Sequence, residues 1–341
     1  MTVRNSLFAA LSVFALAPAA PAWNRSPAVE FATLPPGLRN PEGITVDRST
    51  GQFYVADFDY RGSRTGNGQI AVFSQSGRLL RVLNVPGTSS ALLGLDFHPT
   101  TGELLVIDFG GHKVVRVNPQ TGASAPFTTI PGASGPNALA FDLPAGNVYI
   151  SDSFQGIIWR TGAGGGAAVP WVTSPLLATT GVPPFGANGM AFNKAQSILF
   201  VANTGNDTIV RIPVVAGVPG TPDTFVNSIN GADGLVIDDE DNLWVCANQA
   251  DEIVVVDKTG KAIAKLGDFE GIAPDGSPRG LLFPASLVFF GEFVYVTNLA
   301  LDLRDFNPQF NAVDSQWAAE VTTYNVARIS RHLPPLRDQK H

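Results

Sequence analysis

The stretch GADGLVIDDEDNLWVC, residues 231–246, sets a carboxylate, Asp233, directly before an apolar run, and a second apolar run follows a short acidic turn. Runs rich in Val, Leu and Ile that are broken by turn residues are typical of short antiparallel strands. The stretch therefore predicts a β-hairpin with an acid at the entrance to its first strand. Because one copy would say little, the number of copies along the chain decides the fold.

The same pattern occurs six times. The six copies are PEGITVD (41–47), LLGLDFH (92–98), PNALAFD (136–142), ANGMAFN (187–193), ADGLVID (232–238) and PASLVFF (284–290). A second apolar run follows each copy and ends in Asp or Asn. These final residues, which stand at a constant interval in five of the six copies, are Asp57, Asp108, Asp152, Asn203, Asn248 and Asn298.

Two further strand-like runs complete each unit. Four strands in each unit of about 45–50 residues predict an all-β fold, a six-bladed β-propeller. The sixth unit supplies only three strands, ASLVFF, FVYVTN and YNVARIS. We therefore expect the N-terminal run AVEFATLP (28–35) to form the outer strand of that last blade. This pairing closes the ring and removes an exposed sheet edge.

The composition is that of a globular chain with many turns. Its 341 residues are 45% hydrophobic and 15% charged and include 35 Gly and 26 Pro, which excludes a disordered class. The formal net charge of −7 argues against a nucleic-acid partner, because phosphate binding needs a basic face. Cys246 is the only cysteine and stands in an apolar run, so we expect a buried structural thiol.

The first residues have the pattern of an export signal. Arg4 precedes the apolar residues 7–16, and the sequence Ala20-Pro21-Ala22 follows. Residues 1–22 are therefore predicted to be a cleaved signal peptide, and residues 23–341 a single propeller domain that is secreted or periplasmic. An uncleaved anchor is the alternative. No later apolar run has the length of a membrane-spanning helix, so the chain is not expected to span a membrane, and we expect a monomer.

In a propeller, the position before each innermost strand points into one shared space at a mouth of the central channel. We call these six positions the axial column; in blade order they hold Glu42, Leu93, Asn137, Asn188, Asp233 and Ala285. Two carboxylates and two amide oxygens, without Cys or His, suit a hard cation and balance the charge of a dication. The predicted ligands of Ca²⁺, with Mg²⁺, Mn²⁺ or Zn²⁺ as alternative ions, are Glu42, Asn137, Asn188 and Asp233.

Turn chemistry is the alternative interpretation of this column. Asn and Asp are common before strands because they satisfy backbone groups in turns, which would explain Asn137, Asn188 and Asp233 one by one. Glu42 is poorly explained in that way, since its longer side chain makes such turns badly. The second column, which ends in Asn298, occurs in all six blades and is predicted to cap the turn after each second strand.

Four long connections are expected at the same mouth, at residues 58–68, 176–187, 270–282 and 299–320. Long loops on a rigid scaffold commonly hold binding residues. The aromatic residues expected to form a partly apolar rim are Phe58, Tyr60, Phe185, Phe306 and Trp317. The candidate substrate-binding residues are Tyr60, His112, Phe185 and Ser286. For His112, a solvated loop position is the alternative.

The stretches ADGLVIDDEDNLWVC, ANGMAFN and PEGITVD resemble the regucalcin (senescence marker protein) and gluconolactonase family of six-bladed propellers. The resemblance spans nearly the whole mature chain and rests on motifs that recur in register. It implies that a divalent metal, usually Ca²⁺, is held by Glu42, Asn188 and Asp233, and that Asn137 is a further ligand or holds water and substrate. It also implies that Asp233 acts as a general base in the hydrolysis of lactones or related esters.

One position departs from this family's pattern. Regucalcin-like members place a substrate-binding Arg two residues before the Asn matched by Asn137, and this chain has Gly135 there. A polar sugar lactone is therefore less expected as the substrate than another lactone or ester.

The favoured function is a secreted Ca²⁺-dependent hydrolase of small-molecule lactones or related esters, with Asp233 and Asn137 as catalytic residues. Two alternatives stay open. One is a non-catalytic propeller with NHL-type repeats that binds a protein or glycan. That class needs the second column but not the first, so Glu42 and Asp233 argue against it. The other is an exported metal-binding or structural protein without turnover, since a metal site alone does not make an enzyme.

Overall fold

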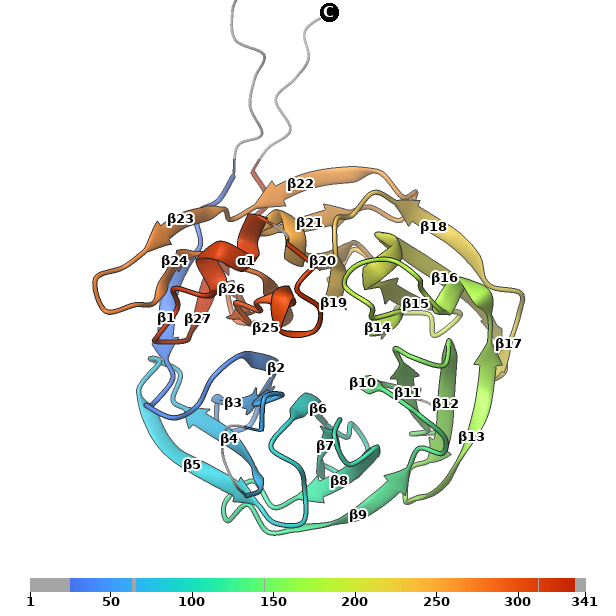
Figure 1. Ribbon diagram of the computed structural model, residues 1–341. Helices are drawn as coiled ribbons and strands as arrows, with labels where there is room; N and C mark the ends of the chain where they lie inside the picture. The colour runs from blue at the N-terminus through green and yellow to red at the C-terminus, as the bar shows by residue number, and fades with distance from the viewer. Residues whose placement is uncertain (1–24, 63–65, 144, 312, 335–341) are drawn as a thin grey trace, which may run out of the picture.

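The computed structural model describes residues 25–62, 66–143, 145–311 and 313–334 and arranges six β-sheets in a ring around a central axis (Figure 1). Within each sheet the strands are antiparallel and follow one another outward from the axis. This confirms the prediction of an all-β, six-bladed propeller. The predicted signal peptide, residues 1–22, lies outside the described residues.

The first three blades each consist of four consecutive strands. Blade 1 comprises β2 (Pro41–Asp47), β3 (Gln52–Asp57), β4 (Gly68–Phe73) and β5 (Leu79–Val85). Blade 2 comprises β6 (Leu92–Phe97), β7 (Leu104–Asp108), β8 (Lys113–Val117) and β9 (Ser124–Thr129). Blade 3 comprises β10 (Pro136–Phe141), β11 (Val148–Asp152), β12 (Ile157–Gly162) and β13 (Gly165–Thr173).

The other three blades vary this plan at their outer edges. Blade 4 comprises β14 (Ala187–Phe192), β15 (Ile198–Asn203) and β16 (Thr208–Val215), which pairs with both β17 (Val218–Pro219) and β18 (Asp223–Asn227). Blade 5 comprises β19 (Ala232–Ile237), β20 (Leu243–Ala247), β21 (Glu252–Val256) and β22 (Ala262–Leu266). Blade 6 comprises β25 (Pro284–Phe290), β26 (Phe293–Asn298), β27 (Asn325–Ser330) and β1 (Val29–Thr33).

The outer strand of blade 6 comes from the other end of the chain. Strand β1 pairs antiparallel with β27, with Val29 opposite Arg328 and Thr33 opposite Asn325. In Figure 1 the blue β1 lies beside the red β27. The first described strand and the last one thus belong to the same sheet.

Short elements outside the blades lie in the connections. They are the hairpin β23 (Phe269–Ile272) and β24 (Pro278–Gly280), the helix α1 (Val313–Ala318), and the 3₁₀ turns η1 (Pro175–Leu177), η2 (Thr204–Asn206), η3 (Asn248–Ala250) and η4 (Leu303–Asp305). Helix α1 lies on the face turned toward the viewer in Figure 1. In the part of the chain that the structure describes, no helix is long and apolar enough to cross a bilayer.

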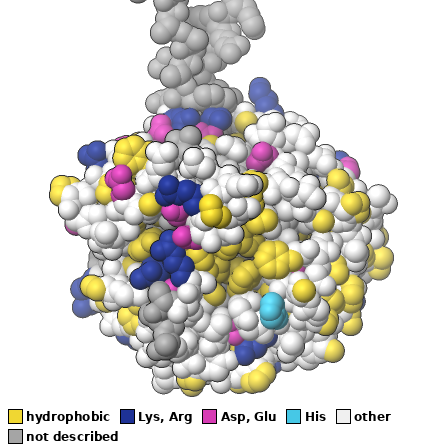
Figure 2. Space-filling view, in the orientation of Figure 1, with side chains coloured by type: hydrophobic (Ala, Val, Ile, Leu, Met, Phe, Trp, Pro, Cys, Tyr) yellow, Lys and Arg dark blue, Asp and Glu magenta, His cyan; other side chains and the backbone are white. Residues whose placement is uncertain are grey.

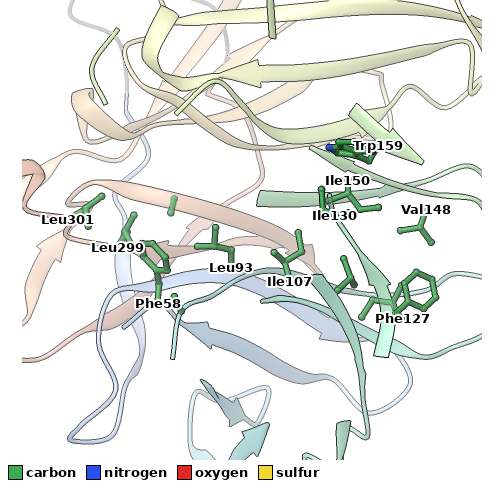
Figure 3. Packing of buried hydrophobic residues seen from close by; sticks show 14 of the residues in the cluster. Phe58, Leu93, Ile107, Phe127, Ile130, Val148, Ile150, Trp159, Leu299 and Leu301 are labelled. Atoms are coloured by element: carbon green, nitrogen blue, oxygen red, sulfur yellow. The ribbon is translucent and has the colours of Figure 1, made fainter. Parts of the chain in front are cut away.

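Apolar side chains from neighbouring blades pack against each other and hold the ring together. Figure 3 shows one such cluster, in which Ile107 of blade 2 and Ile150 and Trp159 of blade 3 are buried together. Burying one large apolar side chain contributes about 1.5–3 kcal/mol. Cys246 is fully buried in another of these clusters, as expected for a structural thiol.

Each innermost strand has an irregularity near its start. The pairing register shifts between the first and the fourth residue of the strand in all six blades, at 41/44, 92/95, 136/139, 187/190, 232/235 and 284/287. Such a bulge redirects a side chain that regular alternation would place elsewhere. The axial column occupies the second residue of each strand and therefore lies within this irregular segment in every blade.

Neighbouring innermost strands approach closely just after the axial column, and glycine makes this approach sterically acceptable. A Cβ atom on Gly43 would lie 2.3 Å from the carbonyl oxygen of Leu93, and one on Gly234 would lie 2.4 Å from that of Ala285. No real Cβ tolerates such distances, so these positions need glycine. The close approach brings the axial side chains of different blades into one small space.

Candidate metal centre

The four polar residues of the axial column line one cavity. This cavity has a volume of about 30 Å³, and its polar wall includes Glu42, Asn137, Asn188 and Asp233. Each of the four is between 4% and 6% exposed. Leu93 also lines the cavity, whereas Ala285 lines the channel on the far side. Four side chains that are far apart in the sequence are thus brought together.

The turn-capping column has the predicted role in blades 2, 3 and 4, where Asp108, Asp152 and Asn203 accept backbone N–H groups of the turn after the second strand. Asp57 and Asn298 accept the backbone N–H groups of Arg39 and Leu282, which precede the first strand of their blades. Asp152 Oδ1, for example, accepts hydrogen bonds from the backbone N–H groups of Gly135 and Phe154 at 2.9 and 3.0 Å. In blade 5 the pairing of the first two strands slips by one residue, so that Ala232 lies opposite Ala247 rather than Asn248. Ala247 occupies the cap position of η3 and makes no side-chain cap. The prediction that Asn248 caps a turn is therefore wrong.

In five blades the residue after the turn-capping position lines the cavity or hydrogen-bonds an axial side chain. In blade order this next position holds Phe58, Phe109, Ser153, Thr204, Asn248 and Leu299. It is polar in the three blades whose axial residues are Asn137, Asn188 and Asp233. These polar residues could have been recognised from the sequence, because they stand at or just after the second column, but they were missed.

Each of these three polar residues holds one axial side chain. Ser153 Oγ accepts a hydrogen bond from Asn137 Nδ2 at 3.2 Å. Thr204 Oγ1 accepts one from Asn188 Nδ2 at 3.0 Å. Asn248 Nδ2 donates to Asp233 Oδ2 at 3.0 Å. Partners of this kind orient the groups that bind a metal and tune their affinity for it.

The two acids of the site have unusual protonation equilibria. Burial raises the pKa of Asp233 to about 7, although hydrogen bonds from Asn248 and Asn188 act in the opposite direction. Burial and the charge of Asp233 raise the pKa of Glu42 well above its ordinary value. Without a cation the two carboxyl groups therefore lose their protons at a higher pH than ordinary carboxyl groups do, because burial and mutual repulsion disfavour two negative charges.

The donor set fits a divalent cation. Asp233 Oδ1 is buried and has no hydrogen-bond partner among the described residues. The amide nitrogens of Asn137 and Asn188 are engaged with hydroxyl groups, which leaves their amide oxygens available as ligands. Two carboxylates and two amide oxygens are the hard ligands that Ca²⁺ prefers, whereas Zn²⁺ prefers nitrogen and sulfur. No group of three or more His, Cys, Asp and Glu suited to a metal occurs in the described part of the chain.

The candidate substrate-binding residues separate into different places. Phe185 lines the cavity, and Ser286 lines the channel on the far side. The Tyr60 hydroxyl hydrogen-bonds the Asp305 carboxylate, outside the cavity lining. His112 Nδ1 is hydrogen-bonded to the carbonyl oxygen of Ser134 at 2.6 Å and does not line the cavity either.

The remaining wall of the cavity is apolar. It consists of Phe58, Leu93, Pro183, Phe185, Phe283, Leu299 and Leu301. Figure 3 shows Phe58, Leu93 and Leu299 close together. Trp317 is not part of this wall; it packs against Phe269, with ring centroids 5.5 Å apart, so its predicted place in the rim is wrong. The contributions of Phe283, Leu299 and Leu301 were not expected from the sequence.

On its other side the polar site meets a much wider channel. This channel has a volume of about 1050 Å³, and Glu42, Asn137 and Asn188 belong to its lining. His98 and Asp238, which follow first strands, also line it. The four polar residues therefore separate a narrow apolar mouth from a wide channel of mixed polarity.

Two family models match parts of the chain. Residues 183–267, which include Asn188 and Asp233, match the SMP-30/Gluconolactonase/LRE-like region. Residues 38–73, which include Glu42, match the NHL repeat. No curated protein sequence matches the chain.

Solved structures share the fold over most of their length. Regucalcin from Agrobacterium tumefaciens, a calcium-binding protein, is 17% identical with a TM-score of 0.61, over 92% of this chain and 97% of that one. A putative gluconolactonase is 17% identical with a TM-score of 0.63, over 90% and 92%. A gluconolactonase from Xanthomonas campestris is 14% identical with a TM-score of 0.62, over 92% and 99%. The resemblance stated from the sequence is thus confirmed: residues 183–267 are similar to the SMP-30/gluconolactonase region, and the chain has the six-bladed fold of regucalcin and the gluconolactonases.

Proposed function

We propose that this protein is an exported hydrolase of lactones or related esters that depends on a divalent cation, Ca²⁺ by the chemistry of its ligands. The observation that carries the proposal is the meeting of Glu42, Asn137, Asn188 and Asp233 in one buried cavity. The similarity of residues 183–267 to the gluconolactonase-like region supports the reaction class. The fold shared with a calcium-binding regucalcin supports the choice of ion.

The residues of the site have distinct roles in this proposal. A cation held by the four polar side chains would supply a Lewis acid that polarises the carbonyl group of the substrate. Asp233 Oδ1, buried and without a hydrogen-bond partner in the described structure, is placed to take a proton from water. Asn248 holds the other oxygen and fixes the orientation of the carboxylate.

Asn137 and Asn188 stabilise charge that develops on the substrate. Each side-chain amide has two N–H donors, of which one goes to Ser153 or Thr204. The second donor of Asn137 remains for the carbonyl oxygen as it becomes negative in the transition state, whereas that of Asn188 also serves the Asp233 carboxylate. A positioned donor of this kind typically contributes about 10²–10³-fold in rate.

A first experiment tests turnover. Purified mature protein is treated with chelator, divided, and assayed with and without added Ca²⁺ on a panel of lactones and aryl esters. We expect hydrolysis that disappears with the chelator and returns with Ca²⁺. If no substrate of either class is hydrolysed above the uncatalysed rate at saturating Ca²⁺, the proposal of an enzyme is wrong.

A second experiment separates metal ligand from general base. If Asp233 only holds the cation, excess Ca²⁺ should restore most of the activity of Asp233→Asn, because an amide oxygen still coordinates. If Asp233 also takes the proton, saturating Ca²⁺ should leave a deficit of roughly 10²–10⁴-fold. Asn137→Ala should bind the cation nearly normally but lose turnover if Asn137 mainly serves the substrate.

A non-catalytic binding propeller is the second candidate, and the NHL match over residues 38–73 favours it. That class needs neither Glu42 nor Asp233. Stabilisation by Ca²⁺ that depends on both acids, without hydrolysis of any substrate, would indicate a metal-stabilised binding module.

A further inference from the structure

A closed circuit of aromatic rings lies at the narrow mouth of the cavity. Neighbouring ring centroids are 5.0–6.3 Å apart around the circuit Phe58, Tyr60, Phe306, Phe185 and Phe109. We call these five residues the aromatic collar. Phe154 packs against two members of the collar, Phe109 and Phe185, at 5.7 Å from each. Figure 2 shows hydrophobic side chains gathered over the middle of this face.

The aromatic collar continues into the apolar wall of the cavity. Phe58 and Phe185 belong to both. The position after each turn cap divides the mouth into two halves: it is apolar in blades 6, 1 and 2 (Leu299, Phe58, Phe109) and polar in blades 3, 4 and 5 (Ser153, Thr204, Asn248). At this position the mouth is therefore amphipathic, with hydrogen-bonding groups on one side and carbon surface on the other, and Phe185 adds carbon surface from the connection between blades 3 and 4.

We infer that the substrate of this protein carries a hydrocarbon or aryl group next to its lactone or ester group, and that the aromatic collar and the apolar wall bind this group. This inference rests on the proposed function and names its substrate class. The ester group would face the polar half of the mouth, while the hydrocarbon would lie against blades 6, 1 and 2.

Size is the first argument. A cavity of about 30 Å³ has room for about two water molecules, not for a lactone ring. A substrate that enters from this face must therefore separate the rings of the collar. An apolar substituent replaces the ring contacts that are lost and is itself removed from water.

Polarity is the second argument. The only polar side-chain atom in the collar is the Tyr60 hydroxyl, which is engaged with Asp305; Arg61 Nε donates to the same carboxylate at 2.8 Å. A polyhydroxylated ring in this mouth would bury hydroxyl groups against carbon surface without partners, which is costly. The same site therefore selects against sugar lactones, in agreement with Gly135 at the position where the related family has Arg.

Phe306 is the collar residue best suited to a test. It is 38% exposed, whereas Phe58 and Phe185 are 3% and 8% exposed, so its replacement should disturb the fold least. Trp317 is a matched control, because it is an aromatic residue of the same connection, is 41% exposed and packs against Phe269 instead of the collar.

The experiment measures binding rather than turnover. δ-Lactams that carry alkyl chains of one to six carbons, and gluconolactam, are titrated calorimetrically into the Ca²⁺-loaded protein. We expect the affinity for the alkyl lactams to rise with chain length, by up to about fourfold per buried methylene, and gluconolactam to bind more weakly than all of them. Phe306→Ala should weaken binding of the hexyl lactam by about tenfold or more and leave the methyl lactam nearly unchanged, whereas Trp317→Ala should change neither.

Three results would overturn the inference. They are an affinity that does not rise with chain length in the wild-type protein, tighter binding of gluconolactam than of the hexyl lactam, and equal binding of the hexyl lactam by Phe306→Ala and wild type. The first two need no variant and so do not depend on its folding. If affinity rises with chain length but no lactone is hydrolysed, the inferred apolar pocket is supported and the proposed hydrolase function is wrong. If lactones are hydrolysed but affinity does not change with chain length, the proposed hydrolase function is supported and the inferred apolar pocket is wrong.

Discussion

Asn248 donates a hydrogen bond to Asp233 Oδ2 over 3.0 Å, and a slip of one residue in the pairing of blade 5 is what places it there. In blade 4 the corresponding cap, Asn203, accepts from the backbone N–H of Asn206 at 3.2 Å and so stabilises a turn. In blade 5 the asparagine has moved one position along and holds an acid of the site instead. One residue type thus serves the scaffold in one blade and the candidate metal centre in the next.

Asn248→Ala should weaken Ca²⁺ binding without unfolding the protein. Residues that orient a metal ligand typically account for about 10–100-fold in metal affinity, and we expect a loss of that size in calorimetric titrations. Asn118→Ala is the control, because Asn118 accepts backbone N–H groups in a hairpin away from the cavity lining. Equal losses in both variants would contradict a specific role for Asn248.

Without a divalent cation, the free energy of unfolding should fall as the pH rises from about 5 to about 8. Burial raises the pKa of Asp233 to about 7 in the folded protein, whereas the unfolded chain releases this proton near pH 4. The stabilisation from the bound proton is therefore complete below about pH 4 and is lost as the pH rises through about 7. Glu42, whose pKa is also raised, contributes in the same direction. Thermal melting of chelator-treated protein across this range measures the effect.

Saturating Ca²⁺ should remove most of this pH dependence, because the bound cation, instead of protons, then neutralises the charges of Glu42 and Asp233. Glu42→Gln combined with Asp233→Asn should also flatten the profile. A profile as steep in the double variant as in the parent protein would show that other groups cause it. Both the parent protein and the double variant should carry Asp251→Asn in this comparison. The raised pKa of Asp251 would otherwise add a pH dependence of the same sign.

Asp251 and Asp314 form a second pair of carboxyl groups, where the turn after β20 meets α1. Each is 8% exposed. Burial, followed by the charge of Asp314, raises the pKa of Asp251 to about 8. By the same reasoning, the stabilisation from this proton is lost as the pH rises through about 8. Asp251→Asn keeps the oxygen that accepts the backbone N–H of Phe283 at 2.7 Å and donates permanently to Asp314.

We therefore expect Asp251→Asn to melt at a higher temperature than the parent protein at pH 8, and at nearly the same temperature at pH 5. One pH unit of difference between the folded and unfolded pKa corresponds to about 1.4 kcal/mol. Differential scanning calorimetry at both pH values measures the change. A variant that is destabilised equally at pH 5 and pH 8 would contradict a proton shared between the two carboxyl groups.

The repeat predicted the number of blades, because each copy records the hairpin of one blade. It placed the four polar axial residues in one column for the same reason. It placed the start of the innermost strands only approximately: the axial residues were expected before these strands and are their second residues, within the bulge. Asn248 was assigned wrongly because the slip in blade 5 leaves the spacing in the sequence unchanged. The collar was predicted in part: Phe58, Tyr60, Phe185 and Phe306 were expected at the rim, whereas Phe109 was not. Trp317 lies elsewhere because the path of its long loop depends on tertiary contacts.

The central claim is that the four axial residues bind one divalent cation, and calorimetric titration of chelator-stripped protein with Ca²⁺ tests it most directly. The account predicts saturable binding of one ion per chain. Glu42→Gln and Asp233→Asn should each weaken it by about tenfold or more, while Asp241→Asn, in the hairpin where Asp241 accepts from the backbone N–H of Lys194, should leave it unchanged. Absence of saturable binding, or equal affinities in all three variants and the wild type, would contradict the claim.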